Sequence, residues 1–408
     1  MVRAGWRALA PNGLRLALGK ISGPLYSQLA LAGVRTGQAP FEVADGPIVI
    51  SSLFDSTIGV ARAAQFAADA FERAGLAVER HNLRDALALD AGADLPGDPR
   101  GVWIVNCNAP EARALLARTH RDAWRDRYRI GYWNWELPVP PQGWRSTARL
   151  FHEIWTPSVF SAESFRPFGV PVRVVPPPIA EPTASPEAAR GLPLEDGVLH
   201  ILAMADLGSG LTRKNPLGAV ELFVKLFPAP QSKVRLILKI SGAANDPKGL
   251  ARIMSATGGR HDVILIQERL SDEAMAALSA ACDIFLSLHR SEGFGLAIAE
   301  AMAAGRPSLA TGWSGNMDFM AGTPELCTAY ALRPVPDDTP IYGGYGAHWA
   351  EPDLDDAVHK LGALIESGEL RAALGLRARL QIDDLNAAWS RQAIDARLPP
   401  RRANLSSI

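Results

Sequence analysis

Two successive series of short apolar segments, rich in Val and Ile and separated by longer helical patterns, limit the folds that this chain can adopt. Segments that are apolar along their whole length are typical of strands in parallel sheets, which helices cover on both faces. The first series comprises Ile48–Ser51, Val102–Asn106, Ile130–Trp133, Ile154–Thr156 and Val172–Val175. The second comprises Leu199–Met204, Val234–Ile240, Val263–Ile266, Ile284–Leu288 and Pro307–Ala310. The predicted fold class is therefore α/β, with two Rossmann-like doubly wound domains that face a cleft.

The boundary between the two domains is predicted from proline. Pro176-Pro177-Pro178 opens a stretch rich in Pro, Ala and Glu that runs to Gly197, and consecutive prolines resist helix formation. With 408 residues, the chain is also too long for one ordinary core. We predict a basic leader at 1–44, an N-terminal acceptor-side domain at 45–180, a linker at 181–197, a C-terminal donor-side domain at 198–385, and a helix or tail at 386–408 that packs back on the N-terminal domain.

Composition excludes several classes of protein. The formal net charge is −1, so no overall basic excess exists to bind nucleic acid. Cys107, Cys282 and Cys327 lie far apart and give neither a disulfide framework nor a CxxC metal motif. No apolar run reaches the roughly 18 residues of a membrane span. These features predict a cytoplasmic protein that binds no nucleic acid.

The first residues of the chain differ from the rest because they carry basic residues and no acid before Glu42. The basic residues are Arg3, Arg7, Arg15, Lys20 and Arg35. One interpretation is an amphipathic stretch that contacts an anionic membrane surface at the inner face of the cell membrane. The alternative is a poorly ordered leader, or one docked on the core.

The segment His289–Gly295 reads as a loop between a strand and a helix over Leu296–Ala304. Gly293 and Gly295 allow close approach of a ligand to the backbone, and amides at a helix start suit a diphosphate. Glu300 follows Glu292 by eight residues, a little over two helical turns, so its carboxylate can lie deeper along one side of the same ligand and accept the hydroxyls of a ribose. The sequence predicts a nucleotide site here.

The same segment carries a family resemblance. Glu292-Gly293-Phe294-Gly295-Leu296 through Glu300, followed by Ala301-Met302-Ala303-Ala304-Gly305, resembles the Glu-x7-Glu signature of family 4 glycosyltransferases, which have the GT-B fold. The resemblance implies that Glu292 contacts the donor sugar and that Glu300 binds the ribose. It also implies that the backbone of Gly293, Phe294, Gly295 and Leu296 holds the sugar and the phosphates.

A second match follows the first strand of the predicted second domain. Arg213-Lys214-Asn215-Pro216 resembles a loop of the same family. By that resemblance Arg213 and Lys214 would neutralise the diphosphate and the charge on the leaving group, and with Glu292 they form the predicted catalytic set. Many members of the family carry a further arginine before this lysine, and here that position is Gly208.

Two further features are predicted on the donor side. The loop Ser314-Gly315-Asn316 resembles one that lines the donor sugar in relatives, and its alternative interpretation is a Gly-rich surface turn. His289 ends a predicted strand, where it contacts the donor or fills a structural role.

The first domain carries two acceptor-side candidates. Thr57 and Gly59 lie in a small-residue loop before a helix predicted over Val60–Ala74, a position suited to phosphate or acceptor. Trp133, Trp135 and Glu136 belong to a segment that resembles a Trp-x-Trp-Glu loop of bacterial family members, and aromatic faces can stack on sugar rings. The alternative for the tryptophans is an aromatic core cluster.

The resemblance implies a reaction as well as a fold. It implies transfer of a hexose from a nucleoside diphosphate sugar, with retention and without a metal or other cofactor, to a saccharide or lipid-linked acceptor. The setting would be bacterial lipopolysaccharide or exopolysaccharide synthesis. The alternatives are another enzyme of this fold, such as an epimerase or a phosphorylase, and a non-catalytic nucleotide-sugar-binding partner, which Gly208 favours.

Overall fold

A computed structural model of the chain describes residues 25–26, 28–34, 42–56, 59–84, 95–181 and 187–401. The chain divides into two compact units: Met1–Pro178 with Ala387–Ile408, and Ile179–Asn386. The first unit therefore consists of two separate stretches of chain. Residues 181 and 187–197, the described part of the predicted linker, belong to the second unit. The basic residues of the leader lie outside the described residues.

The first unit contains a six-stranded parallel sheet in the order β2-β1-β3-β4-β5-β6. The strands are β1 (Ile48–Ser52), β2 (Val78–Asn82), β3 (Val102–Asn106), β4 (Tyr128–Tyr132), β5 (Glu153–Thr156) and β6 (Val172–Val174). Strands β1 and β3 are buried at every residue, as their apolar sequences predicted. The edge strand β2 has the polar sequence VERHN, and the apolar pattern did not reveal it.

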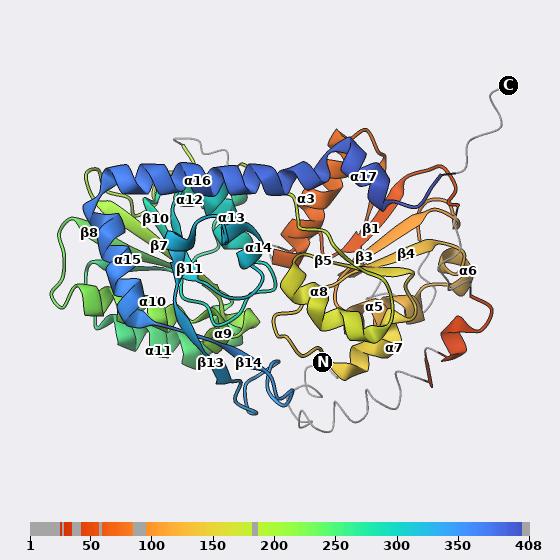
Figure 1. The fold of residues 1–408 in the computed structure, drawn as a ribbon, viewed down its shortest axis with the longest axis horizontal. Helices are drawn as coiled ribbons and strands as arrows, with labels where there is room; N and C mark the ends of the chain where they lie inside the picture. Colours follow the sequence, from red (N-terminus) through yellow and green to blue (C-terminus); the bar gives the residue numbers. More distant parts are fainter. Residues whose placement is uncertain are drawn as a thin grey trace. The chain divides into compact units, whose positions relative to one another are not determined.

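Helices cover the sheet of the first unit, and they include one from the C-terminal stretch. The helices are α3 (Gly59–Arg73), α5 (Ala109–Arg118), α6 (Arg121–Trp124), α7 (Arg145–Ala148), α8 (Val159–Phe165) and α17 (Arg391–Arg397). Figure 1 shows α17 in blue beside α3 and β1. Phe71 of α3 packs edge-on against Trp389, with ring centroids 5.2 Å apart, and the Trp389 indole donates to the Pro176 carbonyl at 2.7 Å.

The second unit contains another six-stranded parallel sheet, in the order β12-β11-β10-β7-β8-β9. The strands are β7 (Leu199–Asp206), β8 (Val234–Ser241), β9 (Val263–Ile266), β10 (Ile284–Ser287), β11 (Ser308–Thr311) and β12 (Cys327–Thr328). Within this unit the order is third, second, first, fourth, fifth, sixth, which is the Rossmann order. The direction of the order reverses between β7 and β10, and ligands of such sheets bind beyond the strand ends at that point.

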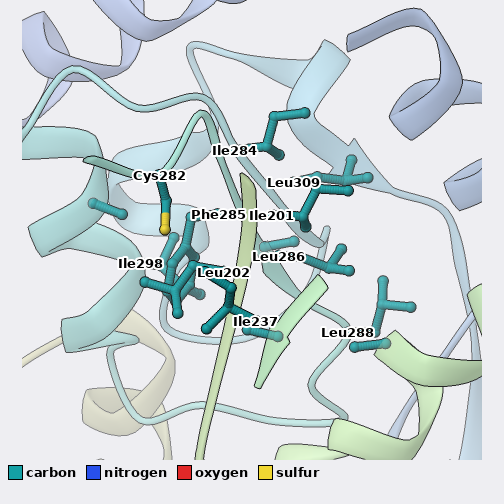
Figure 2. Packing of buried hydrophobic residues seen from close by; sticks show 14 of the residues in the cluster. Ile201, Leu202, Ile237, Cys282, Ile284, Phe285, Leu286, Leu288, Ile298 and Leu309 are labelled. Carbon is teal, nitrogen blue, oxygen red and sulfur yellow. The ribbon is translucent and has the colours of Figure 1, made fainter. Parts of the chain in front are cut away.

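The core of the second unit lies between this sheet and its helices. Ile201, Leu286 and Leu309 are fully buried on β7, β10 and β11, and Ile298 packs on the sheet from α13 (Figure 2). The helices are α9 (Leu211–Lys214), α10 (Pro216–Leu226), α11 (Pro247–Thr257), α12 (Asp272–Ala281), α13 (Leu296–Ala303), α14 (Met317–Met320), α15 (Leu354–Glu366) and α16 (Gly368–Asn386).

Two features complete the second unit. An antiparallel hairpin, β13 (Tyr330–Pro334) and β14 (His348–Pro352), stands apart from the main sheet. At the ends of the unit, the Asn386 side chain accepts from the Ile179 amide at 2.8 Å and donates to the Ile179 carbonyl at 2.9 Å. Among the described residues, no helix combines the length and the apolar character needed to cross a membrane.

Candidate functional site

The candidate site of the second unit is formed by the loops after β7, β10 and β11, three neighbouring strands. The loop after β7 carries Arg213 and Lys214, the loop after β10 carries Glu292, and the loop after β11 carries Ser314. Because the carboxyl ends of parallel strands meet at one edge of the sheet, these loops come together at the reversal between β7 and β10. The sequence predicted this group of residues, and the structure brings it together.

Glu292 is the centre of the group. Lys214 Nζ donates to Glu292 Oε1 at 2.6 Å, and Arg213 Nη1 lies 3.2 Å from Glu292 Oε2. Glu292 is 7% exposed, so its carboxylate is held by two cations in a nearly dry setting. Burial alone would raise the pKa of Glu292, but the charges of Lys214 and Arg213 outweigh it and lower the pKa to about 2. Glu292 is therefore ionised at any physiological pH.

The two cations differ in what they can reach. The Arg213 side chain is 3% exposed and donates to the Ser291 carbonyl at 2.7 Å, and its guanidinium lies 5.4 Å from the centre of the Tyr342 ring. The Lys214 side chain is 25% exposed. Both were predicted to meet the diphosphate. In this structure Lys214 is the cation that solvent reaches, while Arg213 supports the loop of Glu292 from within.

Local backbone chemistry explains the position of Lys214. Asn215 adopts the left-handed conformation at φ 52°, and its side chain caps α10 by accepting from the Gly218 amide at 3.2 Å. Pro216 follows at the first turn of α10, where its missing amide costs nothing. Asn215 Nδ2 also donates to the Leu288 carbonyl at 2.8 Å. The Arg-Lys-Asn-Pro sequence thus ends one short helix, starts the next and fastens both to the β10 loop.

The loop after β11 holds the backbone of Glu292 by hydrogen bonds. The Glu292 amide donates to Ser314 Oγ at 2.8 Å, and the Gly315 amide donates to the Glu292 carbonyl at 2.9 Å. A Cβ atom at Gly315 would collide with the carbonyl of Gly293. Ser314, Gly315 and Asn316 are all buried. In this structure they hold the loop that carries Glu292, and their place beside the donor sugar stays a prediction.

His289 has a structural setting. Its ring is buried, and Nδ1 lies 3.1 Å from Ser287 Oγ. Nε2 faces two acceptors, Asn316 Oδ1 at 3.1 Å and the Trp313 carbonyl at 3.3 Å. The proton therefore resides on Nε2, because an unprotonated nitrogen could not bond to either oxygen. Burial lowers the pKa of His289, so the ring is neutral. In this structure the ring has a positioning role, and its predicted donor contact stays a prediction.

The glycine loop leads into α13. Gly295 has φ 96° and immediately precedes Leu296, the first residue of the helix. Phe294 packs against Phe319, with ring centroids 4.9 Å apart, which fixes the entry to the helix. Glu300 is on the same helix and is buried. The spacing of the predicted nucleotide site is thus present, with Glu292 before the helix and Glu300 inside it.

Gly208, the position at which the family resemblance led us to expect an arginine, lies in a tight turn. Its amide donates to Asp206 Oδ1 at 2.9 Å, and a Cβ atom there would lie 3.0 Å from Asn245 Nδ2. A long side chain at this position would have to displace Asn245.

The acceptor-side candidates fare differently in the first unit. Gly59 begins α3, the helix that follows β1 in the chain, and Thr57 lies outside the described residues. Trp133 is 0% exposed and Trp135 is 3% exposed, so neither indole presents a face to a sugar. The proposal of a stacking platform is corrected by this burial. Glu136 is partly exposed.

The tryptophans belong to an aromatic core cluster. The Trp133 ring meets those of Trp144, Phe151 and Phe165 edge-on, with centroids 5.8, 5.9 and 5.7 Å away. The Trp135 indole donates to the Val139 carbonyl at 2.8 Å. Edge-on contacts of this kind stabilise a core beyond simple burial.

Metal ligands do not gather in the described part of the chain. No group of three or more His, Cys, Asp or Glu side chains there could hold a metal ion.

Two α/β units with parallel sheets, the second in Rossmann order, define the GT-B class of fold, and solved structures agree. A glycosyltransferase from Rickettsia africae ESF-5 has a TM-score of 0.62 at 12% identity, over 86% of this chain and 98% of that one. The α,α-trehalose 6-phosphate synthase from Burkholderia multivorans has a TM-score of 0.58 at 12% identity, over 86% and 97%. HepE from Anabaena, in complex with UDP and glucose, has a TM-score of 0.56 at 14% identity, over 86% and 99%. At these identities the likeness shows the fold alone, and the predicted α/β fold class of GT-B type is confirmed.

The comparison with protein families matches part of the second unit. Residues 206–381 match the family described as Glycosyl transferases group 1. This range contains Lys214, Glu292 and Glu300. The sequence has no match among curated proteins. The family match and the fold together support a glycosyltransferase.

Proposed function

We propose that this protein transfers a glycosyl group from a nucleoside diphosphate sugar to an acceptor hydroxyl. The observation that carries the proposal is the buried carboxylate of Glu292, which lies 2.6 Å from Lys214 Nζ at the reversal point of a Rossmann sheet. A cation beside a carboxylate at the start of a helix can hold a diphosphate and a sugar side by side.

Lys214 is proposed to stabilise the leaving group. As the bond between the sugar C1 atom and the diphosphate oxygen breaks, negative charge grows on that oxygen, and a fixed ammonium offsets it. The acceptor oxygen bonds to C1, and its proton passes to the departing diphosphate on the same face. This course gives retention, needs no metal and leaves atoms and charge balanced.

Glu292 is proposed to orient the donor sugar. A carboxyl group with a pKa near 2 carries no proton to donate, so it accepts hydrogen bonds from sugar hydroxyls and does not act as an acid. A covalent double displacement would need a carboxylate on the opposite face of the sugar. Glu300 is proposed to accept the ribose hydroxyls, with Gly293 and Gly295 admitting the phosphates.

Finer assignments extend the proposal. The Glu-x7-Glu pattern supports family 4 and a hexose donor, and the Trp-x-Trp-Glu segment supports a bacterial enzyme of surface polysaccharide synthesis. The acceptor is proposed to be a saccharide or a lipid-linked saccharide, with Gly59 and Glu136 on its side. The basic leader is proposed to bring the protein to an anionic membrane surface.

Uracil is the first donor base to test. HepE from Anabaena was solved with UDP-glucose, and the trehalose-phosphate synthase from Burkholderia xenovorans is described as UDP-forming. These descriptions apply to those proteins, and they place UDP-glucose first in a panel with GDP-mannose, UDP-N-acetylglucosamine and dTDP-rhamnose.

The test combines thermal shift with release of the nucleoside diphosphate, with and without a chelator. We expect one donor to stabilise the protein, to lose that effect in Glu300→Ala and in Lys214→Ala, and to ignore the chelator. A donor that binds equally well to both variants would refute the assigned site. A donor that binds without being turned over in the presence of any acceptor or water would favour a non-catalytic binding partner. Release of an epimerised donor would favour an epimerase.

A further inference from the structure

Arg290, the neighbour of His289 in the loop after β10, joins three segments around the candidate site. Its amide donates to the Arg213 carbonyl at 2.8 Å, and Nη1 donates to the Thr212 carbonyl at 2.7 Å. Its own carbonyl accepts from the Ala350 amide at 2.9 Å. One residue of the β10 loop is therefore bonded to the loop after β7 and to strand β14.

An ion pair strengthens the link to the hairpin. Arg290 Nε and Nη2 donate to the two carboxylate oxygens of Glu351, both at 2.6 Å. This two-point contact between a planar guanidinium and a carboxylate fixes orientation as well as distance. The guanidinium also lies 6.0 Å from the centre of the Trp349 ring, which is buried. Strand β14 is thus attached to Arg290 by three consecutive residues.

The loop of the hairpin returns to the same place. Tyr342, within the 335–347 loop, is buried with its ring 5.4 Å from the Arg213 guanidinium. A Cβ atom at Gly210 would lie 3.5 Å from that ring, so the loop packs closely on the segment before Arg213. The base of the hairpin is held by Arg290, and its loop covers the arginine that supports Glu292.

We infer that Arg290 is a positioning residue that holds the β13–β14 hairpin over the Arg213–Lys214 segment, and that the hairpin thereby becomes part of the donor site. This inference rests on the proposed function, because the donor is the ligand whose site is completed. Arg290 acts through Arg213 and Glu351 and need not touch the donor itself. Its loss leaves Lys214 and Glu292 present but lets the segment around them move.

The first measurement needs no substrate. In Arg290→Gln the guanidinium bonds to Glu351 and Thr212 are lost, so we expect amide hydrogen exchange of the hairpin, at Val335 and Ala350, to rise by about tenfold. Glu351→Gln should raise the exchange rate of the hairpin amides by a similar factor. The double variant with Arg290→Gln and Glu351→Gln should exchange little faster than either single variant, since both substitutions remove the same ion pair. Arg290→Lys keeps the charge and should restore part of the protection.

The second measurement reads the donor site, with UDP and UDP-glucose as probes. We expect Arg290→Gln to raise the dissociation constant of UDP and the KM for the donor by roughly tenfold, with kcat changed much less. Arg377→Gln is the matched control, because Arg377 pairs with Glu325 at 2.8 Å in the same unit and bonds to no residue of the site loops. Its exchange at the hairpin and its donor KM should match those of the wild type.

The outcomes separate the two proposals. If the wild type binds no nucleoside diphosphate, the proposed function is refuted and the donor role of Arg290 is refuted with it, whatever the exchange result. If the wild type binds the donor and Arg290→Gln leaves either the exchange or the donor KM unchanged, the inference is overturned while the proposed function stands. A fall in kcat with unchanged KM would also overturn it, because that pattern assigns Arg290 to the chemical step.

Discussion

The Nζ atom of Lys214 lies 2.6 Å from Oε1 of Glu292, although 78 positions separate the two residues in the sequence. They come from loops after β7 and β10, the two strands at which the sheet order reverses. The Glu292 carboxylate thus forms an ion pair with Lys214 before any anionic ligand binds. Each of the two charges has a partner of opposite sign, which offsets the cost of removing it from water.

Removing the ammonium should affect the chemical step. We expect Lys214→Met to lower kcat by about 10²- to 10³-fold, the usual effect of losing one group that stabilises the leaving charge. Lys214→Arg should recover part of the rate. Lys225→Met is the control, because Lys225 pairs with Asp355 on the surface of the same unit. Equal rates for Lys214→Met and the wild type would remove Lys214 from the mechanism.

The pH dependence of stability should report Glu292. The ordinary pKa of 4.5 falls to about 2 in the folded protein. Below pH 4.5 the unfolded chain takes up a proton that the folded one refuses, so this stabilisation is present above pH 4.5 and is lost as the pH falls toward 2. Urea unfolding at a series of pH values should show the wild type losing roughly 3 kcal/mol more than Glu292→Gln across that window. Parallel curves for the two proteins would contradict the assignment.

The contact between the two glycine loops should be intolerant of a single methyl group. Gly315→Ala places its Cβ against the Gly293 carbonyl, so we expect a loss of about 1–3 kcal/mol in the free energy of unfolding and weaker donor binding. Gly362→Ala is the control. Gly362 lies within α15 with its nearest contact at 3.9 Å, and alanine there should stabilise the helix by up to about 1 kcal/mol.

Trp133 should behave as a core residue. Trp133→Ala removes a fully buried ring with three aromatic neighbours, and we expect it to cost about 3–5 kcal/mol of the free energy of unfolding. The milder Trp133→Phe should leave the acceptor KM within a factor of two of the wild type. A tenfold rise in acceptor KM at unchanged stability would restore the stacking role that burial argues against.

His289 should remain neutral with its proton on Nε2. Both acceptors of Nε2 are fixed, since Asn316 Nδ2 donates to the Thr311 carbonyl at 2.9 Å and so orients the amide oxygen toward the ring. Nitrogen-15 NMR of the imidazole should show this tautomer at pH 7 and above and a titration midpoint below the ordinary histidine value, because burial lowers the pKa of His289. A doubly protonated ring at pH 7 would contradict it.

The sequence predicted those parts of the fold in which local pattern and environment agree. Val102–Asn106 is a strand with the predicted bounds because a central strand must be apolar along its length. Val263–Ile266 is an edge strand that also has the predicted bounds, because its sequence is apolar throughout. The strand Val78–Asn82 lies at a sheet edge and has a polar sequence, so the search for apolar segments did not predict it. The hairpin was not predicted either, since every residue of its strand Tyr330–Pro334 is exposed.

The site shows the same limit. A glycine loop before a helix is a local feature, so the segment from Glu292 to Glu300 could be predicted. Whether Trp133 faces a ligand or a core depends on distant residues such as Phe151 and Phe165, and local pattern does not contain them. Likewise, Arg290 and Glu351 are 61 positions apart, and nothing in either neighbourhood predicts the pair.

The reciprocal hydrogen bonds between Asn386 and Ile179 have a consequence for synthesis on the ribosome. They bring the first and last residues of the second unit together, so that unit is a continuous stretch that can fold once Asn386 has emerged. Most of the first unit is translated earlier but cannot complete its fold at that stage, because Trp389 and α17 are translated after the whole of the second unit. Until then the apolar surface beside Phe71 lacks that cover, and exposed apolar surface of this kind makes an incomplete chain prone to aggregate.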